Sequence, residues 1–220
     1  MLLDLLLPQR CVACARPGAQ LCDGCRDRIR RLRPPFCERC GAPVAWPVKR
    51  CRECDGRRLA FAQARAAVAY DEVIRAVVAA WKERALRGFV EIAADLVAEE
   101  VPAPDARVVT FVPADPDRRL KRWHHPSEAL ANELGRRWEV PVAAFLRRIR
   151  AAPRQRGLDL ASRRANVRGA FAASQAPTRV CLVDDVYTTG STASAAASAL
   201  RKAGARRVDV VTFARAIRVR

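Results

Sequence analysis

The 220-residue sequence predicts an α/β fold, a mainly parallel sheet with helices, preceded by a small cysteine-rich module. Two observations support this prediction. Eight of the nine cysteines lie before residue 55, and beyond them apolar, strand-like runs alternate with helix-like segments. The composition shift divides the chain into a cysteine-rich module over residues 1–60 and an α/β domain over residues 61–220. We expect the second part to fold without the first.

The cysteines of the first part form four pairs, each with two intervening residues: Cys11/Cys14, Cys22/Cys25, Cys37/Cys40 and Cys51/Cys54. Two thiolates at this spacing bind one metal ion from a tight turn, and two such turns complete a tetrahedral zinc site. The pattern therefore predicts two four-cysteine zinc sites, a double zinc ribbon. These sites are structural, because a closed set of four thiolates has no open position for water. A disulfide framework is the alternative, and the absence of an export signal argues against it.

Two pairings of the cysteines remain open. Sequential sites use the first two pairs for one ion and the last two for the other, whereas a cross-brace joins the first pair to the third. The short loop within each half favours the sequential arrangement. Cys181 falls in an apolar strand far from the other eight, so we exclude it from metal binding.

Strand-like and helix-like segments follow one another after a basic connector over residues 55–65. The expected strands are Ala66–Tyr70, Val108–Val112, Arg179–Val183 and Val208–Ala214. The expected helices are Asp71–Lys82, Gly88–Glu100, Pro126–Trp138 and Thr192–Ala203. Strands that alternate with helices in this way indicate a mainly parallel sheet.

Charge and composition favour some partners over others. The net charge is +18, from 41 Lys and Arg against 23 Asp and Glu, which favours phosphate-bearing partners. Aromatic residues make up 6% of the chain, too few for an extended base-stacking surface. The apolar start, Met1–Pro8, is too short to span a membrane and lacks the basic flank of a signal peptide, although it suits a helical turn that docks on the fold. We expect a cytoplasmic protein with no membrane span.

The most informative stretch runs from Val180 to Thr192. Four apolar residues form a buried strand that ends in Asp184 and Asp185, and ligands of open α/β sheets bind at this edge. A loop of small polar residues then leads into an alanine-rich helix. Backbone N–H groups, hydroxyls and a helix N-terminus together form an anion site that suits one phosphate. Carboxylates beside such a site predict a ligand with hydroxyls next to its phosphate, such as a ribose 5-phosphate.

This stretch resembles the signature by which type I phosphoribosyltransferases bind phosphoribosyl pyrophosphate (PRPP). The resemblance implies that Asp184 and Asp185 hold the ribose hydroxyls as the active-site carboxylates, and that the following loop surrounds the 5-phosphate. It also implies a pyrophosphate loop after an earlier strand, at residues 112–115, and Mg²⁺ bound with the pyrophosphate. The implied PRPP-binding residues are Asp184, Asp185, Val186, Tyr187, Thr188, Thr189, Gly190, Ser191, Thr192, Pro113, Ala114 and Lys82.

Both parts of the chain together are similar to the ComF family of competence-associated proteins, which join cysteine knuckles to a type I phosphoribosyltransferase domain. Trp81–Lys82 resembles the lysine-containing turn of that family, and Gln155–Leu158 followed by Arg163 and Asn166 resembles its glutamine-to-asparagine segment. One segment departs from the family pattern: Arg122–Pro126 stands where an Arg-Gly-Phe/Tyr-Asn-Gln segment is usual. Any substrate contact from that segment is therefore in doubt.

Two further features leave alternatives open. His124 and His125 precede the helix at Pro126, where loop packing is favoured over a catalytic role because adjacent residues rarely converge on one ligand. Residues 147–168 are the most basic part of the chain. They suit a mobile lid over PRPP, a contact with a nucleic-acid backbone, or a solvated surface.

Two classes of function follow. One is an enzyme that transfers a phosphoribosyl group from PRPP to a nucleobase or another nitrogen acceptor. The alternative is a component of DNA uptake that binds single-stranded DNA and uses PRPP as a ligand or regulator.

Overall fold

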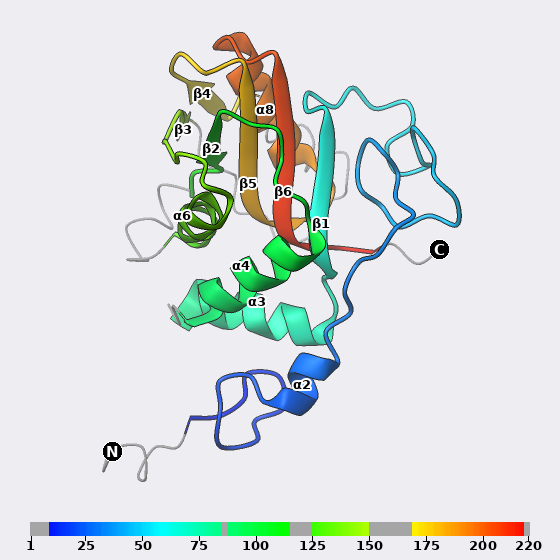
Figure 1. Ribbon diagram of the computed structural model, residues 1–220, viewed down its shortest axis with the longest axis vertical. Helices are drawn as coiled ribbons and strands as arrows, with labels where there is room; N and C mark the ends of the chain where they lie inside the picture. Colours follow the sequence, from blue (N-terminus) through cyan, green and yellow to red (C-terminus); the bar gives the residue numbers. More distant parts are fainter. Residues whose placement is uncertain (1–8, 85–87, 115–124, 150–168, 218–220) are drawn as a thin grey trace.

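A four-stranded parallel sheet in the order β1–β6–β5–β2 forms the centre of the protein (Figure 1). The computed structural model describes residues 9–84, 88–114, 125–149 and 169–217. The strands are Gln63–Ala69 (β1), Val108–Phe111 (β2), Arg179–Tyr187 (β5) and Arg207–Arg215 (β6). Most of their side chains are buried on both faces, as expected of a parallel sheet covered by helices.

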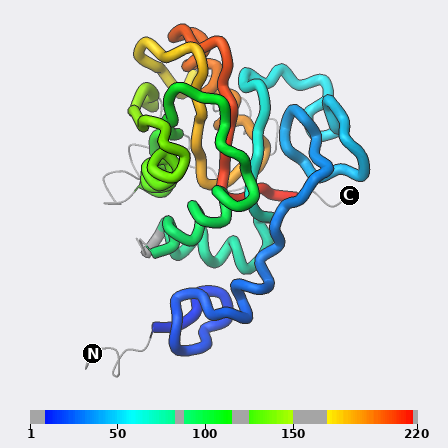
Figure 2. The backbone as a smooth tube through the Cα atoms, viewed as in Figure 1, coloured from blue at the N-terminus to red at the C-terminus, as the bar shows by residue number. Residues whose placement is uncertain are grey.

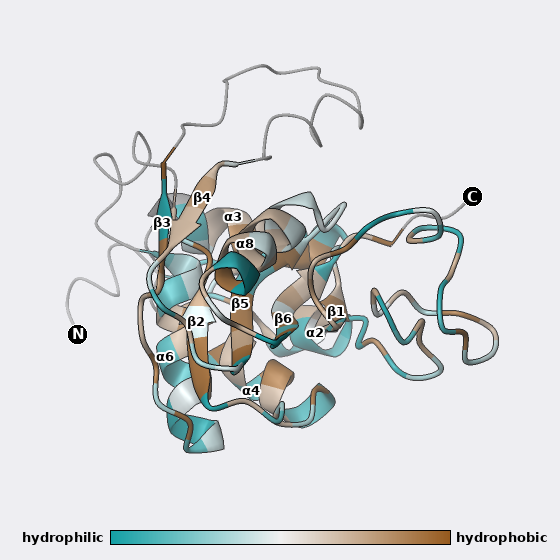
Figure 3. Cartoon of the chain, turned by 90° about the horizontal axis from the view of Figure 1, so that it is seen from above, coloured by the Kyte–Doolittle hydropathy of each residue, from teal (hydrophilic) through white to brown (hydrophobic). Residues whose placement is uncertain are grey.

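Helices cover both faces of this sheet. Two helices, α4 (Gly88–Glu100) and α6 (Pro126–Trp138), pack on one face, and α3 (Glu72–Arg84) lies against α4. The opposite face is covered by α8 (Ser191–Lys202) and by an antiparallel hairpin, β3 (Leu146–Arg148) and β4 (Phe171–Ala173). Figure 3 shows the brown, apolar strands β2 and β5 beside the largely teal helix α6. The core is thus divided into two layers, one on each side of the sheet.

Local sequence explains where the helices begin and end. The Asp71 carboxylate accepts a hydrogen bond from the Ile74 N–H (3.1 Å) and so caps the start of α3. Pro126 occupies the first turn of α6, where its missing N–H has no cost, and Glu139 ends that helix in the left-handed region at φ 55°. Gly190, at φ 69°, provides the turn before the alanine-rich α8.

The predicted fold class is confirmed, with three differences in detail. β5 continues past Val183 to Tyr187, because its parallel register with β6 extends to the pair Tyr187 and Arg215. β1 begins at Gln63, inside the predicted connector. The strands β3 and β4 were not predicted, because three residues are too few to show a periodic pattern.

The cysteine-rich segment is divided between the two faces of the sheet. Cys11 and Cys25 belong to the core layer of α3 and α4, whereas Cys37, Cys40 and Cys54 belong to the layer of α8. Figure 2 shows the blue tube passing from beneath α3 to the side of the sheet. On the way the chain pairs with β1 in antiparallel fashion: the Leu32 N–H donates to Ala67 O and the Ala69 N–H to Arg30 O, both at 2.8 Å.

This packing bears on the predicted division at residue 60, which remains a prediction. Residues 30–32 cover the edge of β1, and the second cysteine cluster shares a core layer with α8. An α/β domain without residues 1–60 would expose both surfaces to water. The shared packing therefore argues against the expectation that the second part folds independently.

Several expectations fall outside the described residues. They concern the apolar start at residues 1–8, Asp115 of the pyrophosphate loop, residues 122–124 of the departing segment, and the basic stretch from 150 to 168. Within the ranges given above, no helix has both the length and the apolar character that crossing a bilayer requires.

Candidate metal centres and anion-binding site

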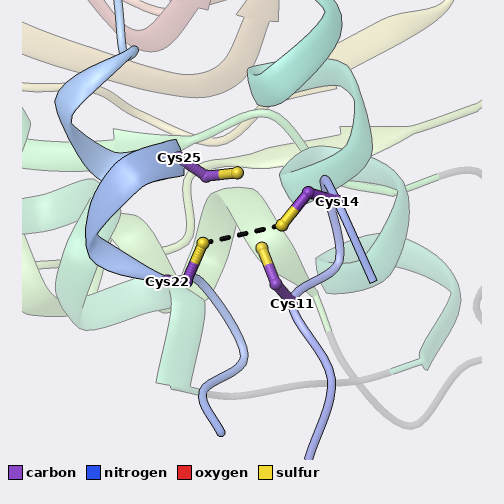
Figure 4. Close-up of side chains that lie close together, drawn as sticks. All are labelled: Cys11, Cys14, Cys22 and Cys25. Carbon is purple, nitrogen blue, oxygen red and sulfur yellow. Dashed lines mark hydrogen bonds between the residues drawn. The ribbon is translucent and has the colours of Figure 1, made fainter. Parts of the chain in front are cut away.

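The first four cysteines converge from a loop and the short helix α2 (Asp23–Asp27). In Figure 4 the sulfur atoms of Cys11, Cys14, Cys22 and Cys25 point toward one another, and all lie within 4.8 Å of each other. The Sγ atoms of Cys14 and Cys22 are 3.6 Å apart. Tetrahedral ligands at 2.3 Å from zinc are about 3.8 Å apart, so this set of donors fits a zinc ion.

The second cluster is formed by the last two pairs, with Sγ distances of 3.6 Å between Cys37 and Cys54 and 3.5 Å between Cys40 and Cys51. It lies directly against β1. A Cβ atom at Gly41, whose φ is +69°, would be 2.3 Å from the Ala64 carbonyl oxygen, so only glycine permits this approach. None of the nine cysteines forms a disulfide. The sequential pairing is confirmed, and both the cross-brace and the disulfide framework are wrong.

A hollow of about 350 Å³ opens at the carboxyl ends of the parallel strands. Asp184, Asp185 and Lys82 meet there, and the lining combines the ends of three strands of the parallel sheet and of β3 with the starts of two helices. The full lining is Tyr70, Lys82, Val112, Pro113, Ala114, His125, Pro126, Ser127, Arg148, Asp184, Asp185, Val186, Thr188 and Thr192. This is the edge at which open α/β sheets bind ligands.

The two carboxylates have different partners. Asp185 Oδ2 lies 2.5 Å from Lys82 Nζ at the end of α3. Asp184 Oδ1 accepts hydrogen bonds from the Ser127 hydroxyl (3.0 Å) and the Asp185 N–H (2.9 Å). Burial and the neighbouring Asp185 charge raise the pKa of Asp184 to about 7, against the lowering effect of Lys82 and these hydrogen bonds. Asp184 can therefore exchange a proton near neutral pH, and the pair carries less negative charge than two exposed carboxylates would.

The loop between β5 and α8 brings hydroxyls and backbone N–H groups to the hollow. The side chains of Thr188 and Thr192 line it. Thr189 and Ser191 instead hydrogen-bond to each other through their hydroxyls (2.8 Å), and the Ser191 N–H donates to Thr189 Oγ1 (3.3 Å). The loop is thus held together by its own side chains. Its hydroxyls and N–H groups, together with the N-terminus of α8, form a site that suits an anion.

Most of the described PRPP-binding candidates converge on the hollow. Of the twelve, Lys82, Pro113, Ala114, Asp184, Asp185, Val186, Thr188 and Thr192 line it. Tyr187 does not: its ring is buried between Phe61 and the guanidinium of Arg215. The position of this side chain does not support the predicted contact of Tyr187 with PRPP. Thr189, Gly190 and Ser191 shape the loop from behind the lining.

Sequence reasoning missed two polar side chains of the lining, Tyr70 and Ser127, which come from distant elements. His125, expected to serve packing, stands at the hollow, as does Arg148 of the basic stretch 147–168. Arg148 lies over the ring of Phe171, 4.6 Å from its centroid. The position of Ser127 in the first turn after Pro126 was the one available signal, because helix starts cluster at this edge of an α/β sheet.

The purified protein should contain two zinc ions per chain, because each cluster offers four converging thiolates. Elemental analysis measures this directly. Replacing Cys14 or Cys51 by serine should each remove one ion, since the two clusters are separate. A variant that loses both ions from one substitution, or a native protein without zinc, would contradict the assignment.

Replacing Asp184 by asparagine should stabilise the fold, and more so as pH rises. The folded pKa of about 7 exceeds the ordinary value of 3.8, so the folded state binds more protons between these values, and the stability this proton provides is lost as pH rises through 7. Asparagine cannot ionise. Because one pKa unit corresponds to about 1.4 kcal/mol, the variant should gain at least ~1 kcal/mol relative to wild type between pH 5 and pH 8.

Thermal melting at the two pH values measures this gain. Asp27→Asn, at an exposed position, is the matched control for loss of one carboxylate. A stability difference between Asp184→Asn and wild type that is equal at both pH values would contradict the raised pKa.

Comparison with known proteins agrees with both halves of this description. Residues 2–55 match the family model of the double zinc ribbon domain. Competence protein F of Haemophilus influenzae is 27% identical over 228 residues, which cover 94% of this chain and 97% of that protein. The DNA utilization protein YhgH of Salmonella typhi is 28% identical over 97% of this chain and its own full length.

Solved structures give weaker likenesses. An allosteric regulatory enzyme of purine biosynthesis matches with a TM-score of 0.41 and 25% identity, over 57% of this chain and 25% of that one. The protein TT1426 from Thermus thermophilus matches with a TM-score of 0.33 and 21% identity, over 57% of this chain and 72% of its own. The two sequence relatives, in contrast, cover 94% and 97% of this chain. The chain is therefore a homologue, over almost its whole length, of competence protein F and of YhgH, with a double zinc ribbon domain at residues 2–55.

Proposed function

We propose that the hollow binds PRPP together with Mg²⁺ and that the protein transfers the phosphoribosyl group to a nitrogen acceptor. The observation that carries this proposal is the meeting of Asp184 and Asp185 with the loop of residues 188–192 in a single hollow. A ribose 5-phosphate presents vicinal hydroxyls and a phosphate, and these two groups of residues complement them. The match of the loop to the PRPP signature supports the same ligand.

Different residues of the hollow would bind different groups of PRPP. Asp184 and Asp185 would accept hydrogen bonds from the ribose hydroxyls, while Thr188, Thr192 and the N–H groups at the start of α8 would hold the 5-phosphate. Lys82, now paired with Asp185, would turn to a phosphate oxygen when the ribose hydroxyls bind that carboxylate. Pro113 and Ala114 would border the pyrophosphate, because they follow the neighbouring strand β2.

In the transfer, a lone pair on the acceptor nitrogen forms a bond to the anomeric carbon of the ribose. The bond from that carbon to the pyrophosphate oxygen breaks, and its electrons leave with pyrophosphate. Positive charge grows on the ribose as the leaving group departs, and the two nearby carboxylates favour that charge. The protein would act mainly by positioning the two reactants.

Magnesium fits the oxygen-rich donors of the hollow, because it binds through one or two carboxylates and substrate phosphates. When bound with pyrophosphate, it supplies positive charge that offsets the charge of the leaving group. Asp184 and Asp185 are the described carboxylates of the lining that face this region.

Asp184→Asn combined with Asp185→Asn should weaken PRPP binding by about two to four powers of ten, measured by calorimetry with Mg²⁺. Each hydrogen bond to a charged carboxylate contributes roughly 1.5–3 kcal/mol, and about 1.4 kcal/mol is a factor of ten. Asp105→Asn is the matched control, because Asp105 precedes β2 at the opposite edge of the sheet. A folded double variant with wild-type affinity would rule out the ribose contact.

A second groove favours an additional candidate function, the binding of single-stranded DNA. It measures about 720 Å³ and lies between residues 56–60 and α8. Arg57, Arg58 and Lys202 line it with three serines of one α8 face, and its lining contains no acidic residue. Charge of this kind attracts a phosphodiester backbone. The name of YhgH, a DNA utilization protein, agrees with such a partner.

Arg58→Gln with Lys202→Gln should lower the affinity for single-stranded DNA and make its salt dependence shallower. For single strands the slope of log affinity against log salt changes by about 0.7 for each phosphate contact, so two lost contacts change it by about 1.4. Arg26→Gln with Arg28→Gln removes the same charge at exposed positions beside the first cluster and serves as control. Equal losses in the two variants would show that net charge, and not this groove, binds DNA.

A further inference from the structure

An arginine is enclosed at the end of the central strand. Arg215, the last residue of β6, is 1% exposed. Its guanidinium donates to the Cys40 carbonyl oxygen (2.6 Å) and to Glu53 Oε2 (2.7 Å), and it lies 3.7 Å from Cys40 Sγ. Cys40 is a ligand of the second cluster, and Glu53 lies between the ligands Cys51 and Cys54. The charge of Arg215 is thus compensated by the cysteine cluster and not by the sheet.

The same guanidinium supports Tyr187, the last residue of β5. It lies 4.5 Å from the centre of the Tyr187 ring, a distance at which a cation and an aromatic face attract each other. The ring of Phe61 packs against the Tyr187 ring in an edge-to-face arrangement, with the two centroids 6.3 Å apart. Tyr187 and Arg215 are also paired in the β5–β6 register, so backbone and side chain act together.

The Tyr187 ring lies directly under the anion loop. A Cβ atom placed on Gly190 would be 2.2 Å from Tyr187 Oη, so the loop rests on this side chain. Gly190 adopts φ 69° and precedes the first residue of α8. Thr188 and Thr192, on either side of this turn, face the hollow. The position of the Tyr187 ring therefore determines where the hydroxyls and N–H groups that would hold a phosphate lie.

The first cysteine cluster offers an internal comparison. Cys11 and Cys25 pack in the layer of α3 and α4, on the opposite face of the sheet from Tyr187. The two clusters have the same ligand set, but the contacts of Arg215 belong to the second alone. The second cluster also shares a core layer with α8, so an effect transmitted by Arg215 is one that Arg215→Met reproduces with both metal ions in place.

We propose that Arg215 is a positioning residue that makes the second cysteine cluster part of the phosphate-binding apparatus. The inference rests on the proposed function for the identity of the ligand, but the positioning of the loop does not depend on it. When the metal is lost or Cys40 and Glu53 move away, the guanidinium loses its partners and turns toward water. The Tyr187 ring then loses its support, and the loop of residues 188–192 loosens.

The first test measures the loop without ligand, by hydrogen–deuterium exchange of the segment that contains residues 188–192 in the full-length protein. Arg215→Met, which keeps the apolar stem but removes the charge, should speed exchange of this segment at least tenfold. Cys51→Ser should do the same, whereas Cys14→Ser, the matched change in the first cluster, should leave the segment at the wild-type rate. Equal exchange in the two cysteine variants, or an unchanged segment in Arg215→Met, would overturn the inference.

The second test measures affinity for PRPP with Mg²⁺ and for inorganic phosphate by calorimetry, with zinc content as a parallel readout. Arg215→Met and Tyr187→Leu should each lose at least tenfold in affinity while keeping two zinc ions, and the double variant should lose no more than either single one. Tyr187→Phe, which keeps the ring, should recover the affinity lost in Tyr187→Leu. Full affinity in folded Arg215→Met and Tyr187→Leu would contradict the positioning role.

The two proposals fail in distinguishable ways. If the wild-type protein binds neither PRPP nor phosphate, the proposed function is wrong, and the exchange measurement still decides the role of Arg215. If the wild type binds PRPP and the variants bind equally well, the positioning role is wrong and the proposed function stands. Should Arg215→Met fail to fold, Tyr187→Leu and Cys51→Ser carry both measurements.

Discussion

The parallel pairing of β5 with β6, continued to Tyr187 and Arg215, determines how the rest of the site is built. This register carries Asp184 and Asp185 to the carboxyl edge of the sheet, next to Lys82 and Ser127. It also places Tyr187 beneath the anion loop and Arg215 against the second cysteine cluster. If β5 ended at Val183, the two carboxylates, Tyr187 and Arg215 would no longer be held in these positions. All of them depend on the extended pairing of β5 with β6 beyond Val183.

Burying charged side chains is the main cost in stability of this arrangement. Asp184 is buried beside a second carboxylate, and its raised pKa reflects first that burial and then the neighbouring charge. Arg215 is enclosed together with its partners, and removing one partner from a buried charge is usually far more damaging than removing an exposed pair. Both groups lie close to the hollow, where an arrangement that suits a ligand need not be the most stable one.

The sequence was informative where the chemistry is local. The spacing of the cysteine pairs predicted both clusters and the short loops favoured their sequential pairing, and the run from Val180 to Thr192 predicted the acidic strand end and the anion loop. Residues from distant elements were not predictable in this way. Ser127 reaches the hollow only because α6 packs against β5, and Arg148 only because the separate hairpin of β3 and β4 packs beside α8. The orientation of Tyr187 depends on how far β5 extends, which apolar periodicity alone does not reveal.

The order of the strands has a consequence for how the protein folds during synthesis. β6 lies between β1 and β5, yet it follows every other strand of the sheet in the sequence. While the ribosome elongates the chain, the two cysteine clusters can close early, because each spans fewer than about twenty residues. Until β6 emerges, β1 and β5 each have an unpaired edge, and unpaired strand edges promote aggregation. Early metal capture, which places residues 30–32 along the other edge of β1, would leave only the edge that faces β6 unpaired in that strand in the meantime.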